Sequence, residues 1–506
     1  MSWLSMMSRG ARTRRRPGLL LGTHAPHFRF NSVSLTPAAQ RYHGLIVGKS
    51  GSGKSKLLQH LMLAHIQNSL KEAPDLTTYS SHGATVLEPH HDLSFDILTS
   101  LVASGFYRRP DAYERVVYLD FGNDWFVPFN VLAGEGDPHE RASLVLDAMY
   151  RIFPEVEWAP TFTRLMLASV VVLIENGLPL TYLAKLFSDK PFRTRCLQAV
   201  AHDQIVSDAF VHYEQLGRDQ AGEAGSTINR AFQIAFNSAT SLSLGQPDNG
   251  LPFRRWMDEG RFIILNIGRI KDGLSRKILG AMLMVQLEQA AKSRMDLLTR
   301  DRVQHTLMVD EWPAFAATGG TFEDMLSQAR KFGLNVLLAC QSLAQIDKQR
   351  LSGAFENCKL GIFFALGHGS AELSSRQIGD LDPYSIKEAV GEGDFRSPTG
   401  HDQYLPLPDQ VQLWTNQLKG LSPRHCYVKM DTAAPVLIRT PLVNDARVDP
   451  EELETVLTTY RQRYQRSRVE AEERVRCLES APPRQQDAVA VGHVPTALDW
   501  DAEQAA

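Results

Sequence analysis

Acidic residues are missing from the start of the chain: within its 506 residues, the first aspartate or glutamate is Glu72. The same stretch holds several arginines, which are Arg9, Arg12, Arg14, Arg15, Arg16, Arg29 and Arg41. Such a start suits contact with nucleic acid or an anionic surface, and equally a flexible solvated tail. It also resembles an organelle transit peptide, but nothing marks a cleavage site. We expect residues 1–18 to form a flexible basic arm.

Cysteines and long hydrophobic runs are also scarce. The five cysteines are odd in number and show no C-x-x-C spacing, which favours a reducing compartment and argues against structural zinc. The longest apolar run, residues 165–174, is too short to cross a bilayer, which takes about 20 residues. The sequence therefore predicts a cytoplasmic protein with no membrane segment of its own.

One glycine-rich stretch fits the phosphate-binding pattern G-x-x-x-x-G-K-[ST]. It consists of Gly48, Lys49, Ser50, Gly51, Ser52, Gly53, Lys54 and Ser55. A short apolar run precedes it, and leucines at helical spacing follow it, as expected of a strand–loop–helix unit that binds phosphates. The pattern predicts that Lys54 reaches the β- and γ-phosphates of ATP and that the Ser55 hydroxyl ligates Mg²⁺.

An acidic pair, Asp310 and Glu311, follows the apolar run 307–309. This placement predicts two carboxylates at the carboxyl edge of a buried strand, where open α/β sheets bind ligands. We expect Asp310 to hold Mg²⁺ through water and Glu311 to orient the attacking water. Gln341 ends the next predicted strand. Its amide could hydrogen-bond the γ-phosphate and so sense hydrolysis, or the residue could be an ordinary polar residue at the end of a strand.

Two arginines are candidates for stabilising charge in the transition state. Arg330 lies between the acidic pair and Gln341, and Arg376 follows the predicted strand at 360–366. An arginine supplied by a neighbouring subunit can contact the transferring phosphoryl group. Each is also readily explained as a surface or salt-bridged residue.

Two further loops follow predicted strands. Residues 88–92, Glu-Pro-His-His-Asp, fit no standard zinc spacing and are better explained as a loop near the nucleotide. Asp120 and Asn130 belong to a similar loop, which would serve either the site or the scaffold.

Alternating strand and helix patterns predict an α/β fold with a mainly parallel sheet. From about residue 138 only helical patterns occur, which indicates an all-helical insertion. The expected organisation is a basic arm (1–18), an ATPase domain in two parts (19–137 and 251–445), the insertion (138–250), a single charged helix to about Leu478 within 446–480, and a disordered tail (481–506).

Segments 48–55, 88–93, 120–132, 310–311 and 326–341, in this order, resemble those of the HerA–FtsK superfamily of P-loop ATPases. More narrowly, they resemble the conjugative DNA-transfer branch, whose members are coupling-protein-like ATPases of type IV secretion. The loop 88–92 departs from the usual Asp-Pro-His-Gly-Asp, and Phe121 stands where proline is usual.

The resemblance implies a RecA-like P-loop domain and a ring, usually a hexamer, that moves DNA or services a secretion channel. It implies that residues 48–55 bind ATP and that Asp310 and Glu311 handle Mg²⁺ and water. Gln341 would sense the nucleotide, and Arg330 and Arg376 become candidates for contacts between subunits. Relaxase or channel proteins would be partners, and a partner would recruit the chain to the inner face of the membrane. The alternatives are a protein-secretion or pilus-assembly ATPase and a nucleotide-gated recruitment factor with little turnover.

Overall fold

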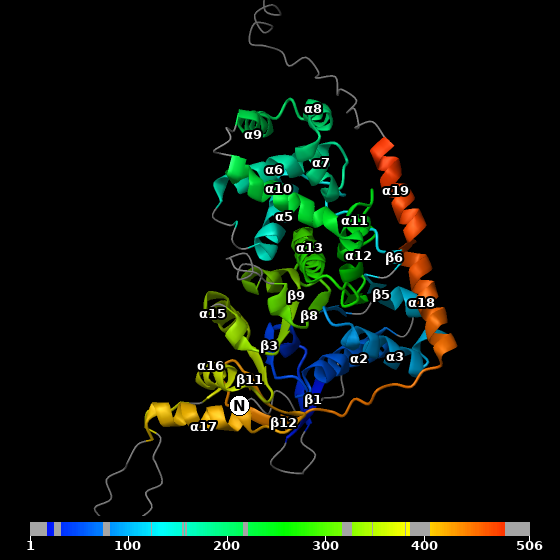
Figure 1. Cartoon of the computed structure of the whole chain (residues 1–506). Helices are drawn as coiled ribbons and strands as arrows, with labels where there is room; N and C mark the ends of the chain where they lie inside the picture. Colours follow the sequence, from blue (N-terminus) through cyan, green and yellow to red (C-terminus); the bar gives the residue numbers. More distant parts are fainter. Residues whose placement is uncertain are drawn as a thin grey trace, which may run out of the picture.

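The computed structural model describes residues 18–24, 32–73, 81–122, 124–153, 156, 159–215, 221–315, 326–346, 348–379, 381–384 and 405–480. Residues 1–17 of the predicted basic arm and the predicted tail 481–506 lie outside this part of the chain. A large sheet occupies one end of the molecule and a group of helices the other (Figure 1). No helix in the described ranges is long and apolar enough to cross a membrane.

The sheet has eleven strands in the order β2-β1-β12-β11-β10-β3-β9-β8-β4-β7-β5. Its strands are β1 (Leu19–His24), β2 (Ser32–Leu35), β3 (Gly44–Val47), β4 (His82–Glu88), β5 (Val116–Asp120), β7 (Phe262–Asn266), β8 (Gln304–Val309), β9 (Leu334–Cys340), β10 (Leu360–Phe363), β11 (His425–Met430) and β12 (Val436–Arg439). The seven strands from β10 to β5 pair in parallel, and the remaining pairs are antiparallel. The predicted mainly parallel α/β fold is therefore confirmed.

The central strands are buried on both faces, because helices cover each side. β3, β4 and β7 have no exposed residue, as expected of strands inside a parallel sheet. Alternate residues of β3 face opposite ways, and Ile46 belongs to the apolar cluster that includes residues of the helices α2 (Lys54–Glu72), α3 (Asp92–Ala103) and α4 (Ala112–Arg115). Leu45 and Val47 belong instead to the apolar cluster on the other face of the sheet, which includes residues of α13 (Gly273–Lys292).

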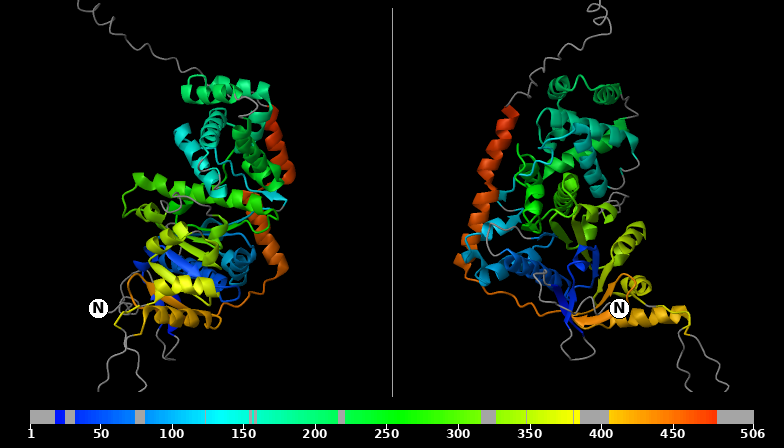
Figure 2. Two further views of the ribbon diagram at one scale, coloured as in Figure 1. Left: turned by 60° about the vertical axis from the view of Figure 1, so that its left-hand side comes forward. Right: turned by 180° about the vertical axis from the view of Figure 1, so that it is seen from behind.

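Between β5 and β7 the described residues form the short strand β6 (Trp125–Phe126) and then a series of helices. These are α5 (Pro138–Ile152), α6 (Pro160–Glu175), α7 (Leu183–Ser188), α8 (Lys190–Ala199), α9 (Gln204–Gln215), α10 (Ala221–Phe236), α11 (Ser238–Leu244) and α12 (Phe253–Asp258). Figure 2 shows α5 to α10 stacked beyond α13, away from the antiparallel end of the sheet, whereas α12 packs beside α13 and against β4. Helices α15 (Lys348–Asn357), α16 (His368–Ile378) and α17 (Leu407–Lys419) flank the other end.

The C-terminal part of the chain differs from the prediction of one continuous helix. The structure has two helices, α18 (Pro450–Tyr464) and α19 (Arg468–Ser480), with the two-residue strand β13 (Arg466–Ser467) between them. β13 pairs with β6, and Gln465 is extended, with φ −127° and ψ 161°. The helix ends because this long-range pairing takes the backbone groups that another helical turn would use.

Candidate nucleotide-binding site

The phosphate loop connects the carboxyl end of β3 to the first turn of α2. Gly51 and Gly53 have φ values of 74° and 110°, a backbone region in which other residues are strained. The loop is held by neighbouring strands, since Gly48 N donates to Cys340 O (3.2 Å) and Lys49 N donates to Ala365 O (2.8 Å). The first N–H groups of a helix lack intrahelical partners, so the start of α2 offers donors for an anion.

Lys54 meets the acidic pair that follows β8. Its Nζ lies 2.5 Å from Asp310 Oδ1 and 3.5 Å from Glu311 Oε2. The side chains of Lys54 and Asp310 are only 7% and 5% exposed. A buried cation is thus shared between two carboxylates at the place where the predicted phosphates would lie.

Ser55 and Asp310 supply oxygen atoms to the same place. Ser55 Oγ donates to Asp310 Oδ2 at 3.3 Å. Mg²⁺ prefers oxygen ligands and usually keeps several waters and substrate phosphate oxygens. This donor set therefore fits a magnesium ion completed by a nucleotide.

Glu311 has a strained backbone. Its φ of 50° is positive, and strain of this kind in a residue other than glycine costs roughly 1–3 kcal/mol. Glu311 Oε1 accepts the backbone N–H of Gln341 at 3.3 Å, while Oε2 is buried without a hydrogen-bond partner. The carboxylate is thus held at Oε1 by the Gln341 N–H and at Oε2 by the nearby Lys54 ammonium, so Oε2 would become open to a water molecule only when Lys54 moves away.

The lining of the surrounding cleft extends beyond these residues. The cleft has a volume of about 590 Å³ and is lined by Lys49, Ser50, Gly51, Gly53, Lys54, Ser55, Lys56, Glu88, His90, Asp92, Leu93, Phe95, Asp96, Asp310, Gln341 and Asp445. Gln341 and the loop 88–92 thus lie at the cleft. Lys56, Asp96 and Asp445 were not singled out from the sequence, because nothing in the local pattern around Asp445 links it to residue 56.

Glu88 is buried at the carboxyl end of β4. Its carboxylate accepts the N–H groups of Leu93 (2.8 Å) and Ser94 (2.5 Å) at the start of α3. Burial raises the pKa of Glu88 to about 7, although these hydrogen bonds oppose the shift, and the charge of Asp310 adds a smaller increase. Glu88 therefore anchors α3 beside the site and carries a proton readily near neutral pH. The available signal in the sequence was an acidic residue four positions before the start of α3.

Asp120 and Asn130 lie on the side of the insertion. Asp120 ends β5 and forms an ion pair with Arg269 at 3.2 Å. Asn130 Oδ1 accepts from Leu132 N (2.9 Å), and its amide donates to Pro247 O (3.3 Å). Neither residue lines the cleft, and their contacts hold loops in place.

The two candidate arginines lie outside the cleft lining. Arg330 precedes β9, at the amino end of the parallel strands, and its guanidinium lies 4.9 Å from the centre of the Tyr42 ring. The six residue steps of β9 separate this edge from the phosphate-loop edge by about 20 Å. Arg376 is exposed in the last turn of α16. The structure therefore does not bring either arginine to the site of its own chain.

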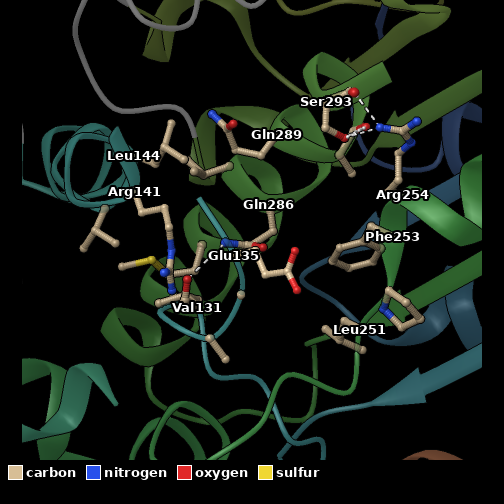
Figure 3. A pocket seen from close by; sticks show the side chains of 17 residues that line it. Val131, Glu135, Arg141, Leu144, Leu251, Phe253, Arg254, Gln286, Gln289 and Ser293 are labelled. Carbon is tan, nitrogen blue, oxygen red and sulfur yellow. Dashed lines mark hydrogen bonds between the residues drawn. The ribbon is translucent and has the colours of Figure 1, made fainter. Parts of the chain in front are cut away.

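A second cavity, of about 300 Å³, lies between α5, α12 and α13 (Figure 3). Its polar lining is largely engaged: Arg141 donates to Leu132 O, Gln286 Nε2 donates to Val131 O at 3.4 Å, and Arg254 bonds Ser293. No phosphate-loop residue lines it. This cavity is separate from the nucleotide cleft.

A phosphate loop after a central parallel strand, with an acidic pair on a nearby strand, defines the fold of a P-loop NTPase. Among solved structures, the chain is similar to the bacterial conjugative coupling protein TrwBdeltaN70 in its unbound form, with a TM-score of 0.58 and 14% identity over 88% of this chain and 93% of that one. It is also similar to the plasmid coupling protein TrwB in complex with ADP and Mg²⁺, with a TM-score of 0.56 and 14% identity over 87% and 98% of the two chains. At this identity the similarity establishes the shared fold. No family model and no curated protein matches the sequence.

Proposed function

We propose that this chain is an ATP-hydrolysing motor that acts as a ring, as a hexamer, and moves DNA for a conjugation or type IV secretion machine. The observation that carries the proposal is the buried contact of Lys54 with Asp310 and Glu311, on a fold shared with the plasmid coupling protein TrwB. A solved structure of TrwB contains ADP and Mg²⁺, which supports the same ligand class here.

The site residues then have distinct roles. Lys54 leaves the carboxylates to contact the β- and γ-phosphates, and the residues of the phosphate loop hold the phosphate oxygens. Ser55 and Asp310 would hold Mg²⁺, which neutralises charge on the phosphates. Glu311 orients the attacking water with its second oxygen, and Gln341, whose N–H holds the first, reports the state of the γ-phosphate.

The partners in this proposal are DNA, further copies of the chain, and a relaxase or channel protein. Recruitment by such a partner would place a cytoplasmic motor at the inner face of the membrane. Arg330 and Arg376 remain candidates for the arginine supplied to a neighbouring subunit.

The test is ATP turnover with and without single- and double-stranded DNA of increasing length, together with the mass of the assembled protein. A motor is expected to show stimulation that grows with DNA length in a multimeric assembly. Slow turnover that DNA does not change would instead support a nucleotide-gated recruitment factor. Rapid turnover that only a protein substrate stimulates would support a secretion ATPase.

A further inference from the structure

A segment far from the sequence motifs also contacts the phosphate loop. Residues 440–449, here called the strap, run without helix or strand from the end of β12 to the start of α18. Figure 1 shows the strap passing along the edge of the sheet domain to α18, after which α19 continues toward the insertion. The strap therefore links two distant parts of the molecule.

The first end of the strap is fixed to the phosphate loop by Arg424. Arg424 N donates to Ser52 O at 2.9 Å, and Thr440 N donates to Arg424 O at 2.8 Å. The guanidinium donates twice to Thr440 O, from Nη2 at 2.7 Å and from Nε at 3.2 Å. One residue thus joins the phosphate loop to the first residue of the strap.

The backbone of Arg424 is held in an unfavourable conformation. Its φ is 66°, and three of the four described non-glycine residues with positive φ (His91, Glu311 and Arg424) belong to loops around the cleft. A side chain on Gly53 would lie 3.5 Å from the Arg424 backbone, so the two segments are in direct contact. Strain that persists at one place requires surrounding contacts to maintain it.

The strap contacts the nucleotide cleft a second time at Asp445. Lys56 Nζ, in the first turn of α2, lies 2.7 Å from Asp445 Oδ1 and 2.6 Å from Asp96 Oδ2. Asp445 is 83% exposed, and exposed ion pairs contribute little to stability. Its position in the cleft lining is therefore of more interest than its contribution to folding.

The far end of the strap leads to the helical insertion. Tyr460 of α18 donates to Val116 O of β5 at 2.8 Å, and Gln465 Nε2 donates to Asp120 O at 2.7 Å. Arg466 then forms an ion pair with Asp248 (2.8 Å), and Gln246 Nε2 donates to Ala471 O of α19 at 3.2 Å. The chain from Asp445 to α19, together with these contacts, connects the cleft to residues 246–248.

We propose that Arg424 is a positioning residue of the phosphate loop, and that the strap transmits nucleotide occupancy to the helical insertion through β13 and α19. The inference rests on the proposed function in that it takes ATP as the ligand of the cleft. Coupling of this kind requires that the strap make different contacts in the two nucleotide states. The contacts of Arg424 and Asp445 with the cleft are where such a difference would arise.

The first test compares Arg424→Ala, Arg424→Lys and Asp431→Ala in steady-state ATP turnover. Arg424→Ala keeps the backbone N–H that bonds Ser52 O but loses the guanidinium bonds to Thr440 O, which help to hold the strained Arg424 backbone against the phosphate loop. KM for ATP should therefore rise about tenfold with kcat nearly unchanged, because the loop binds the ground state and the transition state alike. Arg424→Lys, which keeps one charged donor, should restore part of the loss. Asp431 also has positive φ (52°) but lies at the other end of β11, so Asp431→Ala is the matched control and should leave KM unchanged.

The second test measures hydrogen exchange of residues 466–478 with and without saturating ATPγS. In the wild-type protein nucleotide should change exchange there, and in Arg424→Ala this change should be lost although the phosphate loop is still protected. Asp445→Asn removes an exposed charge and should leave the fold intact, while weakening the nucleotide-dependent change in hydrogen exchange. This variant tests the inference even if Arg424→Ala fails to fold. Two outcomes would overturn this inference while leaving the proposed function intact. In one, wild-type protein binds ATPγS but hydrogen exchange at 466–478 does not change; in the other, the variants show the same change in exchange as the wild type. Wild-type protein that binds no nucleotide would overturn the proposed function as well.

Discussion

Lys54 and Asp310, 256 residues apart in sequence, form a buried ion pair of 2.5 Å between the first turn of α2 and the end of β8. Glu311 lies 3.5 Å from the same ammonium group. The lysine thus attracts both neighbouring carboxylates and offsets the repulsion between them. The cation predicted to bind phosphate therefore also stabilises the acidic pair.

This relationship predicts a strong energetic coupling. Lys54→Ala should lower the free energy of unfolding by about 3 kcal/mol, because removal of one partner leaves buried charge uncompensated. Asp310→Asn in the Lys54→Ala background should recover part of that loss. Denaturant unfolding of the two single variants and the double variant, without nucleotide, measures the coupling. Additive effects would show that the ion pair does not operate as a unit.

Glu311→Gln should separate binding from hydrolysis. Glutamine keeps an oxygen for the Gln341 N–H but cannot accept a proton from water, so kcat should fall by about 100-fold or more. Affinity for a fluorescent ATP analogue should change little, because Glu311 is not a phosphate ligand in this scheme. Asp301→Asn, at an exposed site beyond α13, is the control for loss of one carboxylate. Wild-type turnover in Glu311→Gln would mean that another group positions the water.

The buried Glu88 predicts an unusual dependence of stability on pH. Its pKa is raised from 4.5 to about 7 in the folded protein, so between these values the folded state binds more protons than the unfolded state. The contribution of Glu88 to stability should therefore fall as pH rises through this window, by about 3 kcal/mol in total.

The measurement is the difference in unfolding free energy between wild type and Glu88→Gln from pH 4.5 to 7. Taking this difference cancels the contribution of His305 to stability, which rises with pH because burial lowers the pKa of His305 to about 3. Asp92→Asn, exposed in the first turn of the same helix, is the control. A difference that stays constant with pH would show that Glu88 is ionised throughout.

Arg330 should act, if it acts in catalysis, only between subunits. It lies at the opposite edge of the sheet from the phosphate loop of its own chain and stacks on Tyr42. Mixing the Arg330→Ala and Lys54→Ala proteins should then restore ATP turnover. In mixed assemblies the intact phosphate loop of an Arg330→Ala subunit can meet the intact Arg330 of a Lys54→Ala subunit. The same mixing with Arg376→Ala tests the other candidate. Absence of restoration, with mixed assemblies verified by mass, would assign Arg330 a structural role.

Local patterns were the most predictable part of the molecule. The strand, glycine loop and helix around Lys54 are encoded within some twenty-five residues, and burial of Asp310 at a strand end follows from its apolar neighbours. The roles of Arg424 and Asp445 were not predictable, because their contacts with Ser52 and Lys56 depend on chain segments that meet only in the fold. The break between α18 and α19 was missed for the same reason, since helical periodicity continues through Gln465 while strand pairing with β6 decides the backbone.

The position of β3 has a consequence for synthesis of the protein. Val47, at the edge of the phosphate loop, pairs in register with Cys340 and Phe363. A nascent chain that has made β3 must therefore wait for both strand neighbours to emerge, which takes about 15 to 60 s at ribosomal rates of roughly 5–20 residues per second. During that time an apolar strand lacks its partners and is a natural client for chaperones. The phosphate loop is thus translated well before the strands that flank β3, and it acquires its final geometry only after they have emerged.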